Sequence, residues 1–589
     1  MFIVVALFAA LFAVFPLTDT DIWWHLACAR EWVSTWTPVR TPVVNVHEYF
    51  QQVVGFVYGI GGAPLLVAFK AALWAAVFWL FLRRSHSRLV NRLAENNQDC
   101  QSCHTENDPD CQSRHTENDP DCQNRHTEND PDCQNRHAGL DPASLLKLIV
   151  TLILLFIFRY HFEIRPVLFS LIFLGIYWNV LPILFHASCE SCPPSCDTSE
   201  KKTLVSCSLK PVTCILFFIV LLIQWFWCKC QGLYILGTLF ALLCLTAHLL
   251  ELRMRKEKVC SKNMAVRVAF VLLLFAMPFL HREGLSLFLY PFGLLDRLLG
   301  LTPSAAVFAS EIAENRSPVM LLLAGENVLE SLLMIVLCAV GIIVSLKGFF
   351  LRNSEFGIRS SEYVWLGVTT VLAFVAERNF VLFLPVLLCV VFRFFDKFRK
   401  ILSSKLCQLS SNTELQPSNT KLRIATSLVT RLSSLVSRLS SLVSPLSSLL
   451  FLSFLLGLWA RSLSAYDYSM IAYQRVPVDA AHWMLEHPHQ GRLFNDDRAG
   501  GYLAFVNPAD SIYIDGRFIL KTADFFERYL EYANNPAQFV HDADSLNIDR
   551  AIFPIRYYAR WDNLLQILDR DSRWHLIYRD EYFVVLDKN

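Results

Sequence analysis

Long apolar segments are the feature of this sequence that most limits what it can fold into. A helix that crosses a bilayer needs about 20 apolar residues. Eleven segments approach or exceed that length, and the shortest are Leu145–Phe158, Tyr363–Val375 and Leu446–Trp459. The other eight are Met1–Leu17, Leu65–Leu82, Val167–Phe185, Pro211–Trp227, Leu233–Leu250, Ala265–Leu280, Val319–Leu346 and Phe380–Phe395. With 54% hydrophobic residues and a mean hydropathy of +0.37, the chain is expected to be an α-helical polytopic membrane protein with about eleven spans.

Basic residues cluster after the even-numbered segments, and this predicts the orientation of the chain. They follow the second, sixth, eighth and tenth segments, as Arg83, Arg84, Arg88, Arg92, Arg253, Arg255, Lys256, Lys258, Lys262, Lys347, Arg352, Arg393, Lys397, Arg399 and Lys400. Loops rich in Lys and Arg remain in the cytoplasm, so we expect the N-terminus inside and the C-terminal end outside. Met1–Leu17 has no basic start and no cleavage site, and is expected to be an uncleaved first span. The net charge of +1 gives no indication of a nucleic-acid partner.

Three polar inserts interrupt the apolar pattern, at residues 85–143, 187–210 and 401–445. The first contains four near-identical copies of an 11-residue unit that begins DCQ, and the third contains the heptad-like units LVTRLSS, LVSRLSS and LVSPLSS. The second contains CESCPPSC. Polar segments without apolar periodicity cannot bury a core, so we expect disordered cytoplasmic loops. A soft-metal site on the Cys and His residues and a short coiled coil are the alternatives.

Residues 465–589 lack the long apolar segments of residues 1–460, which we assign to the transmembrane domain. Helices are predicted at Val478–Glu486, Ala523–Ala533 and Trp561–Leu568. Strands are predicted at Arg492–Asn495, Ser511–Asp515 and Ala551–Ile555, with a hairpin formed by His575–Tyr578 and Tyr582–Leu586. Alternating helices and strands predict a small soluble α/β domain outside the cytoplasm. No cysteine lies beyond Cys407, so this domain has no disulfide.

The first predicted outside loop carries two carboxylates, two indoles and an imidazole within Thr18–His25. Asp19 and Asp21 are spaced to share a divalent cation, and either can act as general base for a hydroxyl. Trp23 and Trp24 suit an aromatic belt at the membrane interface or a lipid-linked substrate. The alternative interpretation is that all of these are belt aromatics and solvated acids.

Four further polar turns follow odd-numbered segments and should face the same side. They are Arg159–Pro166, Trp227–Gly232, His281–Glu283 and Glu377–Asn379. Arg165 suits a phosphate group, whereas Glu163 could simply neutralise Arg159. Lys70, inside the second span, is expected to snorkel or to pair. Together the turns predict an outward-facing site whose cations suit a phosphate.

Several of these elements resemble those of bacterial membrane proteins in the C-type glycosyltransferase superfamily. TDTDIWWHLACAREWV resembles the D-x-D-x-W-W-H element, and the stretch that follows it places Glu48. RYHFEIRPVLFS and ERNFVLF resemble the R-P and R-N elements, and FNDDRAGGYLAF and IYIDGR resemble the C-terminal G-G-Y-L and D-G-R elements. The resemblance runs from Leu17 to Val585, interrupted by the inserts. It departs at WCKCQG, where Lys229 and Gln231 replace Asn and His, and at a turn represented only by HREG and Tyr290–Gly293.

The resemblance implies a bundle of spans, a polyprenyl-phosphate-linked sugar donor and a catalytic acid in the first outside loop. Asp21 is then the expected base and Asp19 its partner, with a divalent metal ion possible at this pair. The residues expected to contact substrate are Trp23, Trp24, His25, Glu48, Arg165 and Arg378. The residues expected to shape the outside domain are Asn495, Gly500, Gly501, Asp515 and Arg517.

The sequence therefore predicts a glycosyltransferase of a bacterial-type inner membrane, with the bilayer and the lipid-linked sugar as partners. A transporter or flippase for a polar lipid or solute would use the same charges to line a path. Such a protein is expected to contain repeated halves, which the sequence does not show. A non-catalytic envelope assembly protein is the third alternative, and for it the acidic loop would be dispensable.

Overall fold

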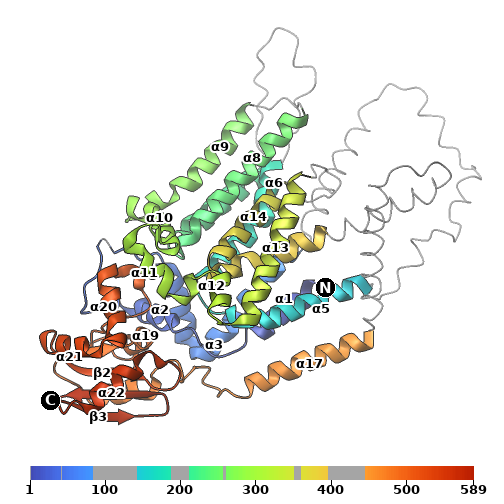
Figure 1. The fold of residues 1–589 in the computed structure, drawn as a ribbon. Helices are drawn as coiled ribbons and strands as arrows, with labels where there is room; N and C mark the ends of the chain where they lie inside the picture. Colours follow the sequence, from blue (N-terminus) through green and yellow to red (C-terminus); the bar gives the residue numbers. More distant parts are fainter. Residues whose placement is uncertain are drawn as a thin grey trace, which may run out of the picture. The chain divides into compact units, whose positions relative to one another are not determined.

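The computed structural model describes residues 2–41, 43–83, 142–186, 211–255, 261–350, 360–394 and 445–589. The predictions made for the three inserts lie outside these residues, apart from a few at their edges. By its contacts the chain divides into two units. The larger comprises Phe2–Leu82, Leu152–Glu414 and Phe454–Asn589, and the smaller comprises Met1, Arg83–Thr151 and Leu415–Ser453. All contacts described here lie within the larger unit, and Figure 1 labels many of its elements.

Each predicted span contains a helix in the structure. The corresponding helices are α1 (Phe2–Phe12), α3 (Glu48–Leu82), α5 (Pro142–Ile157), α6 (Pro166–His186), α7 (Pro211–Trp227), α8 (Ile235–Arg255), α9 (Ser261–Ala276), α13 (Val328–Phe350), α14 (Ser360–Val375), a helix over residues 380–394, and α17 (Pro445–Leu463). Within the described ranges five helices are long and apolar enough to cross a membrane, or six if a pair bent by 101° forms one span. Four more are apolar but shorter. The multi-pass helical class is confirmed, while the number of eleven spans stays a prediction.

Short helices connect the spans and were mostly not predicted. They are α2 (Asp21–Arg30), α10 (Leu285–Leu299), α11 (Pro303–Glu311), α12 (Pro318–Leu323) and the 3-10 helices η3 (Phe158–His161), η4 (Gly232–Tyr234), η5 (Met277–Leu280), η6 (Ala313–Asn315) and η8 (Glu377–Asn379). Two expectations are corrected here. Val319–Leu346 is not one span, because the left-handed residues Gly325 and Asn327 separate α12 from α13. Tyr290–Gly293 is not a turn but lies inside α10.

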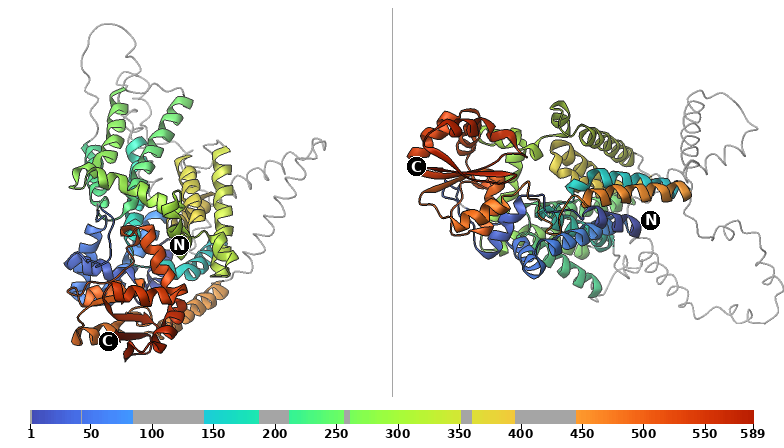
Figure 2. Two further views of the ribbon diagram at one scale, coloured as in Figure 1. Left: turned by 60° about the vertical axis from the view of Figure 1, so that its left-hand side comes forward. Right: turned by 90° about the horizontal axis from the view of Figure 1, so that it is seen from below.

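The C-terminal segment forms the predicted α/β fold. Its elements are α18 (Val478–Glu486), β1 (Arg492–Asn495), α19 (Asp497–Val506), η9 (Phe518–Leu520), α20 (Ala523–Asn534), α21 (Pro536–Ser545), β2 (Ile548–Pro554), η10 (Ala559–Trp561), α22 (Asp562–Arg570), β3 (Trp574–Arg579) and β4 (Phe583–Lys588). The sheet order is β1-β2-β4-β3, parallel between β1 and β2 and antiparallel elsewhere. Helices α21 and α22 lie beside this sheet (Figures 1 and 2). The boundary of a separate domain at residue 465 stays a prediction, because the larger unit includes both the spans and this segment.

Aromatic packing explains why this segment folds as it does. Phe494 of β1 is fully buried and its ring lies 4.7 Å from that of Tyr513 and 5.7 Å from that of Trp561. Such pairs add to the stabilisation from apolar burial. The predicted strand at Ser511–Asp515 is wrong, because Ile512 makes only an isolated bridge with Thr35 of the first outside loop. The segment is therefore held by the loop and by Asn495, not by the sheet.

Candidate functional site

Arg165 joins two carboxylates that are far apart in the sequence. Its Nε and Nη2 donate to Asp19 at 2.8 and 2.9 Å. Its Nη1 and Nη2 donate to Glu314 at 2.6 and 2.7 Å. Planar guanidinium groups bind carboxylates in this two-pronged manner. The bridge therefore fixes the first outside loop, the turn before α6 and η6 against one another.

Asp21 lies beside this bridge as the first residue of α2. Its backbone N–H donates to Asp19 Oδ1 at 3.3 Å, and the residue as a whole is half-buried. Burial and the charge of Asp19 raise the pKa of Asp21 to about 7, although the charge of Arg165 opposes the shift. A carboxyl group with this pKa exists in both protonation states near neutral pH, as a general base requires.

Glu314 behaves in the opposite way and was missed by the sequence reasoning. Burial opposes its ionisation, but the charge and hydrogen bonds of Arg165 and the charge of Arg378 lower the pKa of Glu314 to about 2. Glu314 is thus a fixed anion, whereas Asp21 is able to exchange a proton. The only sequence indication was that an acid precedes the Arg-Ser-Pro turn before α12.

Arg378 supplies a second cation from η8. Burial lowers its pKa, and its charge acts on Glu314, Arg165 and Asp21. Within the described part of the chain no hydrogen bond or ion pair occupies its guanidinium. Arg378 therefore keeps its donors available near the carboxylates, while four of those of Arg165 are already in use.

A buried polar group supports the loop next to this site. Thr18 Oγ1 donates to Glu163, and the Lys70 Nζ lies 3.8 Å from Glu163 Oε2. Lys70 also donates to the Phe15 carbonyl at 3.1 Å. The expected pairing of Lys70 is confirmed. The proposed neutralisation of Arg159 by Glu163 is wrong, because Arg159 instead donates to the Phe156 carbonyl at 2.8 Å.

The side chains of α2 point into the protein. Trp23 is fully buried and packs on Tyr502 at 4.7 Å between ring centroids. Trp24 and His25 are also buried, and the ring centroids of His25 and His47 lie 5.2 Å apart. The indoles therefore do not form an exposed aromatic belt. Their expected contact with substrate stays a prediction.

Glu48 belongs to a second charge cluster. The buried Lys229 Nζ lies 2.8 Å from Glu48 Oε2 and 2.6 Å from Glu283 Oε1. This cluster joins the polar turns Trp227–Gly232 and His281–Glu283 to the start of α3. No hydrogen bond or ion pair among the described residues links Glu48 to Asp19 or Asp21. The structure thus places Glu48 apart from the expected base.

The five residues expected to shape the outside domain lie where it meets α2. Asn495 is buried, donates to the Ile514 carbonyl at 2.7 Å and accepts from the Tyr513 N–H at 2.7 Å. A Cβ at Gly500 would lie 1.9 Å from that same Ile514 oxygen, and one at Gly501 would lie 3.0 Å from the Trp24 nitrogen. Neither position contains space for a side chain. Their structural role stays a prediction that this packing favours.

Asp515 and Arg517 form an ion pair at 2.6 Å. Arg517 also donates to the Val33 carbonyl at 2.9 Å and lies over the Trp32 ring at 4.9 Å. The C-terminal segment thereby contacts the chain just after α2. Gly516, between these two residues, lies directly against Asp21. A Cβ at Gly516 would lie 1.8 Å from Asp21 Oδ1. This contact was not predicted.

At Asp19, where a metal ion was expected to be shared with Asp21, the structure places a guanidinium group. Both oxygens of Asp19 accept hydrogen bonds from Arg165, so a guanidinium already neutralises the carboxylate that would bind the cation. In the described ranges, the three residues whose ligand atoms are arranged for a metal are His161, Glu330 and Glu377.

No protein-family model matches the chain, and no curated protein matches it. Among solved structures, it is similar to the apo oligosaccharyltransferase of Archaeoglobus fulgidus, with 11% identity, a TM-score of 0.47, and coverage of 95% of this chain and 71% of that one. It is also similar to AglB from Archaeoglobus fulgidus in complex with an inhibitory peptide and a dolichol-phosphate, with 11% identity, a TM-score of 0.43 and coverages of 94% and 69%. These are similarities at low identity, and they assign neither an activity nor a ligand to this chain.

We predict that Gly516→Ala displaces Asp21 and loosens the start of α2, since the added Cβ would overlap the carboxylate. Amide hydrogen–deuterium exchange over residues 19–30 should then be faster than in the native chain. Gly293→Ala is the matched control, because a Cβ there meets no atom within 4 Å. Equal exchange in both variants would show that Gly516 does not support Asp21.

Proposed function

We propose that this chain is a membrane glycosyltransferase that moves a sugar from a polyprenyl-phosphate-linked donor to an acceptor hydroxyl. The reaction would take place at the outer face of a bacterial-type inner membrane. The observation that carries the proposal is the position of the Asp21 carboxyl group beside the Arg165 bridge and near Arg378, a cation with free donors. The resemblance of the first-loop and C-terminal elements to the C-type glycosyltransferases points to the same reaction class.

Asp21 is the proposed general base. The acceptor oxygen attacks the anomeric carbon of the donor sugar, and its proton passes to an Asp21 oxygen. A base is effective when its pKa is close to the working pH, which is the condition that burial and Asp19 create for Asp21. Asp19 and Glu314, both tied to Arg165, keep their geometry and act as positioning residues.

Arg378 is the proposed ligand of the donor phosphate. As the bond between the anomeric carbon and the phosphate oxygen breaks, the electron pair leaves with the phosphate and its negative charge increases. Cationic donors placed where charge develops lower the barrier of such a step. Arg165 was expected to share this role, but its hydrogen bonds to Asp19 and Glu314 assign it mainly to holding the site together.

We predict that Asp21→Asn inserts and folds normally but loses about 10²–10⁴-fold in turnover, which is the usual contribution of a general base. Turnover of lipid-linked sugar donors by the purified protein would be measured. Asp569→Asn is the control, since it makes the same change on the exposed side of α22. Full activity of Asp21→Asn would contradict the mechanism and leave the transporter and assembly alternatives.

The rate should also depend on pH in one direction. Below about 7 the Asp21 carboxyl group is increasingly protonated and cannot accept a proton, so kcat/KM should fall as the pH decreases and level off above about 8. Because the pKa of Asp21 is higher in the folded than in the unfolded chain, the free energy of unfolding should decrease as the pH rises from about 4 to about 7. A kcat/KM profile that is flat between about pH 5.5 and 8.5 would exclude Asp21 as the base.

A further inference from the structure

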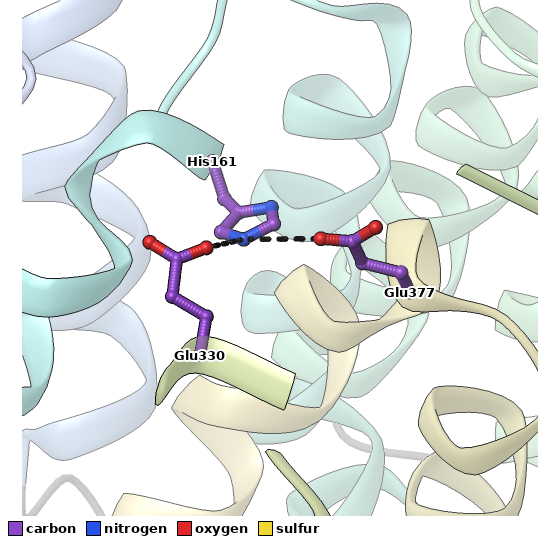
Figure 3. Close-up of side chains that lie close together, drawn as sticks. All are labelled: His161, Glu330 and Glu377. Carbon is purple, nitrogen blue, oxygen red and sulfur yellow. Dashed lines mark ion pairs between the residues drawn. The ribbon is translucent and has the colours of Figure 1, made fainter. Parts of the chain in front are cut away.

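A cluster of metal-ligating groups lies beside the proposed site and takes no part in the mechanism above. His161 ends η3, Glu330 lies in the first turn of α13, and Glu377 begins η8. Figure 3 shows the imidazole between the two carboxylates. The three ligand atoms lie within 4.8 Å of one another, and all three side chains are half-buried. Three segments distant in sequence therefore converge on one point.

The spacing in this cluster is too long for hydrogen bonds but suits a shared ion. His161 Nε2 lies 3.7 Å from Glu330 Oε2 and 3.9 Å from Glu377 Oε1, beyond the range of an N–H···O bond. Ligand atoms about 2.1 Å from one ion in tetrahedral or trigonal geometry are roughly 3.4–3.6 Å apart. A shift of a few tenths of an ångström would bring both His161–glutamate distances into this range.

The charge of the cluster also favours a cation. Glu330 and Glu377 both face His161, and no arginine or lysine in the described part of the chain forms an ion pair with either. The nearby Arg316 is paired with Glu326 at 2.8 Å instead. Two carboxylates held together without a permanent cation repel each other, and a divalent ion would remove that repulsion.

We propose that His161, Glu330 and Glu377 bind one divalent transition-metal ion of the zinc or manganese class. One imidazole with two carboxylates is a ligand set for such ions, whereas Mg²⁺ prefers oxygen ligands alone. The ion would have an open coordination position, since the chain supplies three ligands. This inference does not depend on the proposed transferase activity.

The ion would act as a positioning device. Glu377 directly precedes Arg378 in η8, and His161 lies in the turn that leads to Arg165. Binding both to α13 through Glu330 would fix the two arginines of the candidate site relative to each other. The three ligands themselves have no contact with Asp21, so their role is to hold the site and not to react.

The test measures metal binding directly. The full-length protein in detergent, stripped with EDTA, would be titrated with Mn²⁺ and followed by electron paramagnetic resonance. Mn²⁺ is the probe because the cysteine-containing repeats at residues 99–142 favour softer ions such as Zn²⁺. The native chain should bind one Mn²⁺ that added Zn²⁺ displaces and Mg²⁺ does not. Glu330→Gln should weaken this binding at least tenfold, and the control Glu486→Gln, the same change at an exposed position of α18, should leave it unchanged.

Two further variants keep the test decisive if Glu330→Gln fails to fold. Glu377→Gln and His161→Gln should each weaken Mn²⁺ binding in chains whose thermal unfolding matches that of the native protein. Absence of Mn²⁺ binding by the native chain, or unchanged affinity in the folded variants, would overturn the proposal. Because the readout is metal occupancy, a failure here is distinguishable from a failure of the transferase proposal.

Discussion

The guanidinium of Arg165 is the interaction on which the candidate site depends. It holds Asp19 and Glu314 through four hydrogen bonds, and its charge lowers the pKa of Glu314 and keeps that acid ionised. With those charges fixed, Asp21 is the group whose protonation remains free to change. A buried charge left without its partner is strongly destabilising. Separating the three segments that carry these residues would therefore destabilise the protein.

The C-terminal segment also helps to hold the candidate site in place. Gly516 lies against the Asp21 carboxylate, and Arg517 reaches the Val33 carbonyl beyond the end of α2. Isolated bridges join Leu17 to Ile471 and Thr35 to Ile512 on either side of the same loop. The expected base is thus enclosed by residues nearly 500 positions later in the chain. The C-terminal α/β fold is best understood as part of the site and not as an appendage to the spans.

Much of the fold could be predicted because local patterns determine it. Apolar length marked the spans, and helix α18 and strand β1 begin and end at the predicted residues. Helices α2 and α19 were missed because each is short and is stabilised by packing against the other, at Gly501 and Trp24. The role of Arg165 was incompletely predicted for a similar reason. Its partner Glu314 lies 149 residues away, and no local pattern indicates such a pairing. Asp21 was identified by resemblance, but its raised pKa depends on burial that only the fold creates.

The central claim is that Asp21 and Arg378 form one site for a lipid-linked sugar. A structure of the protein in nanodiscs with a polyprenyl-phosphate sugar would test it most directly. The account predicts the donor phosphate within roughly 3 Å of the Arg378 guanidinium, with the anomeric carbon on the side of Asp21. A phosphate bound instead at Lys229, in the cluster with Glu48 and Glu283, would contradict it.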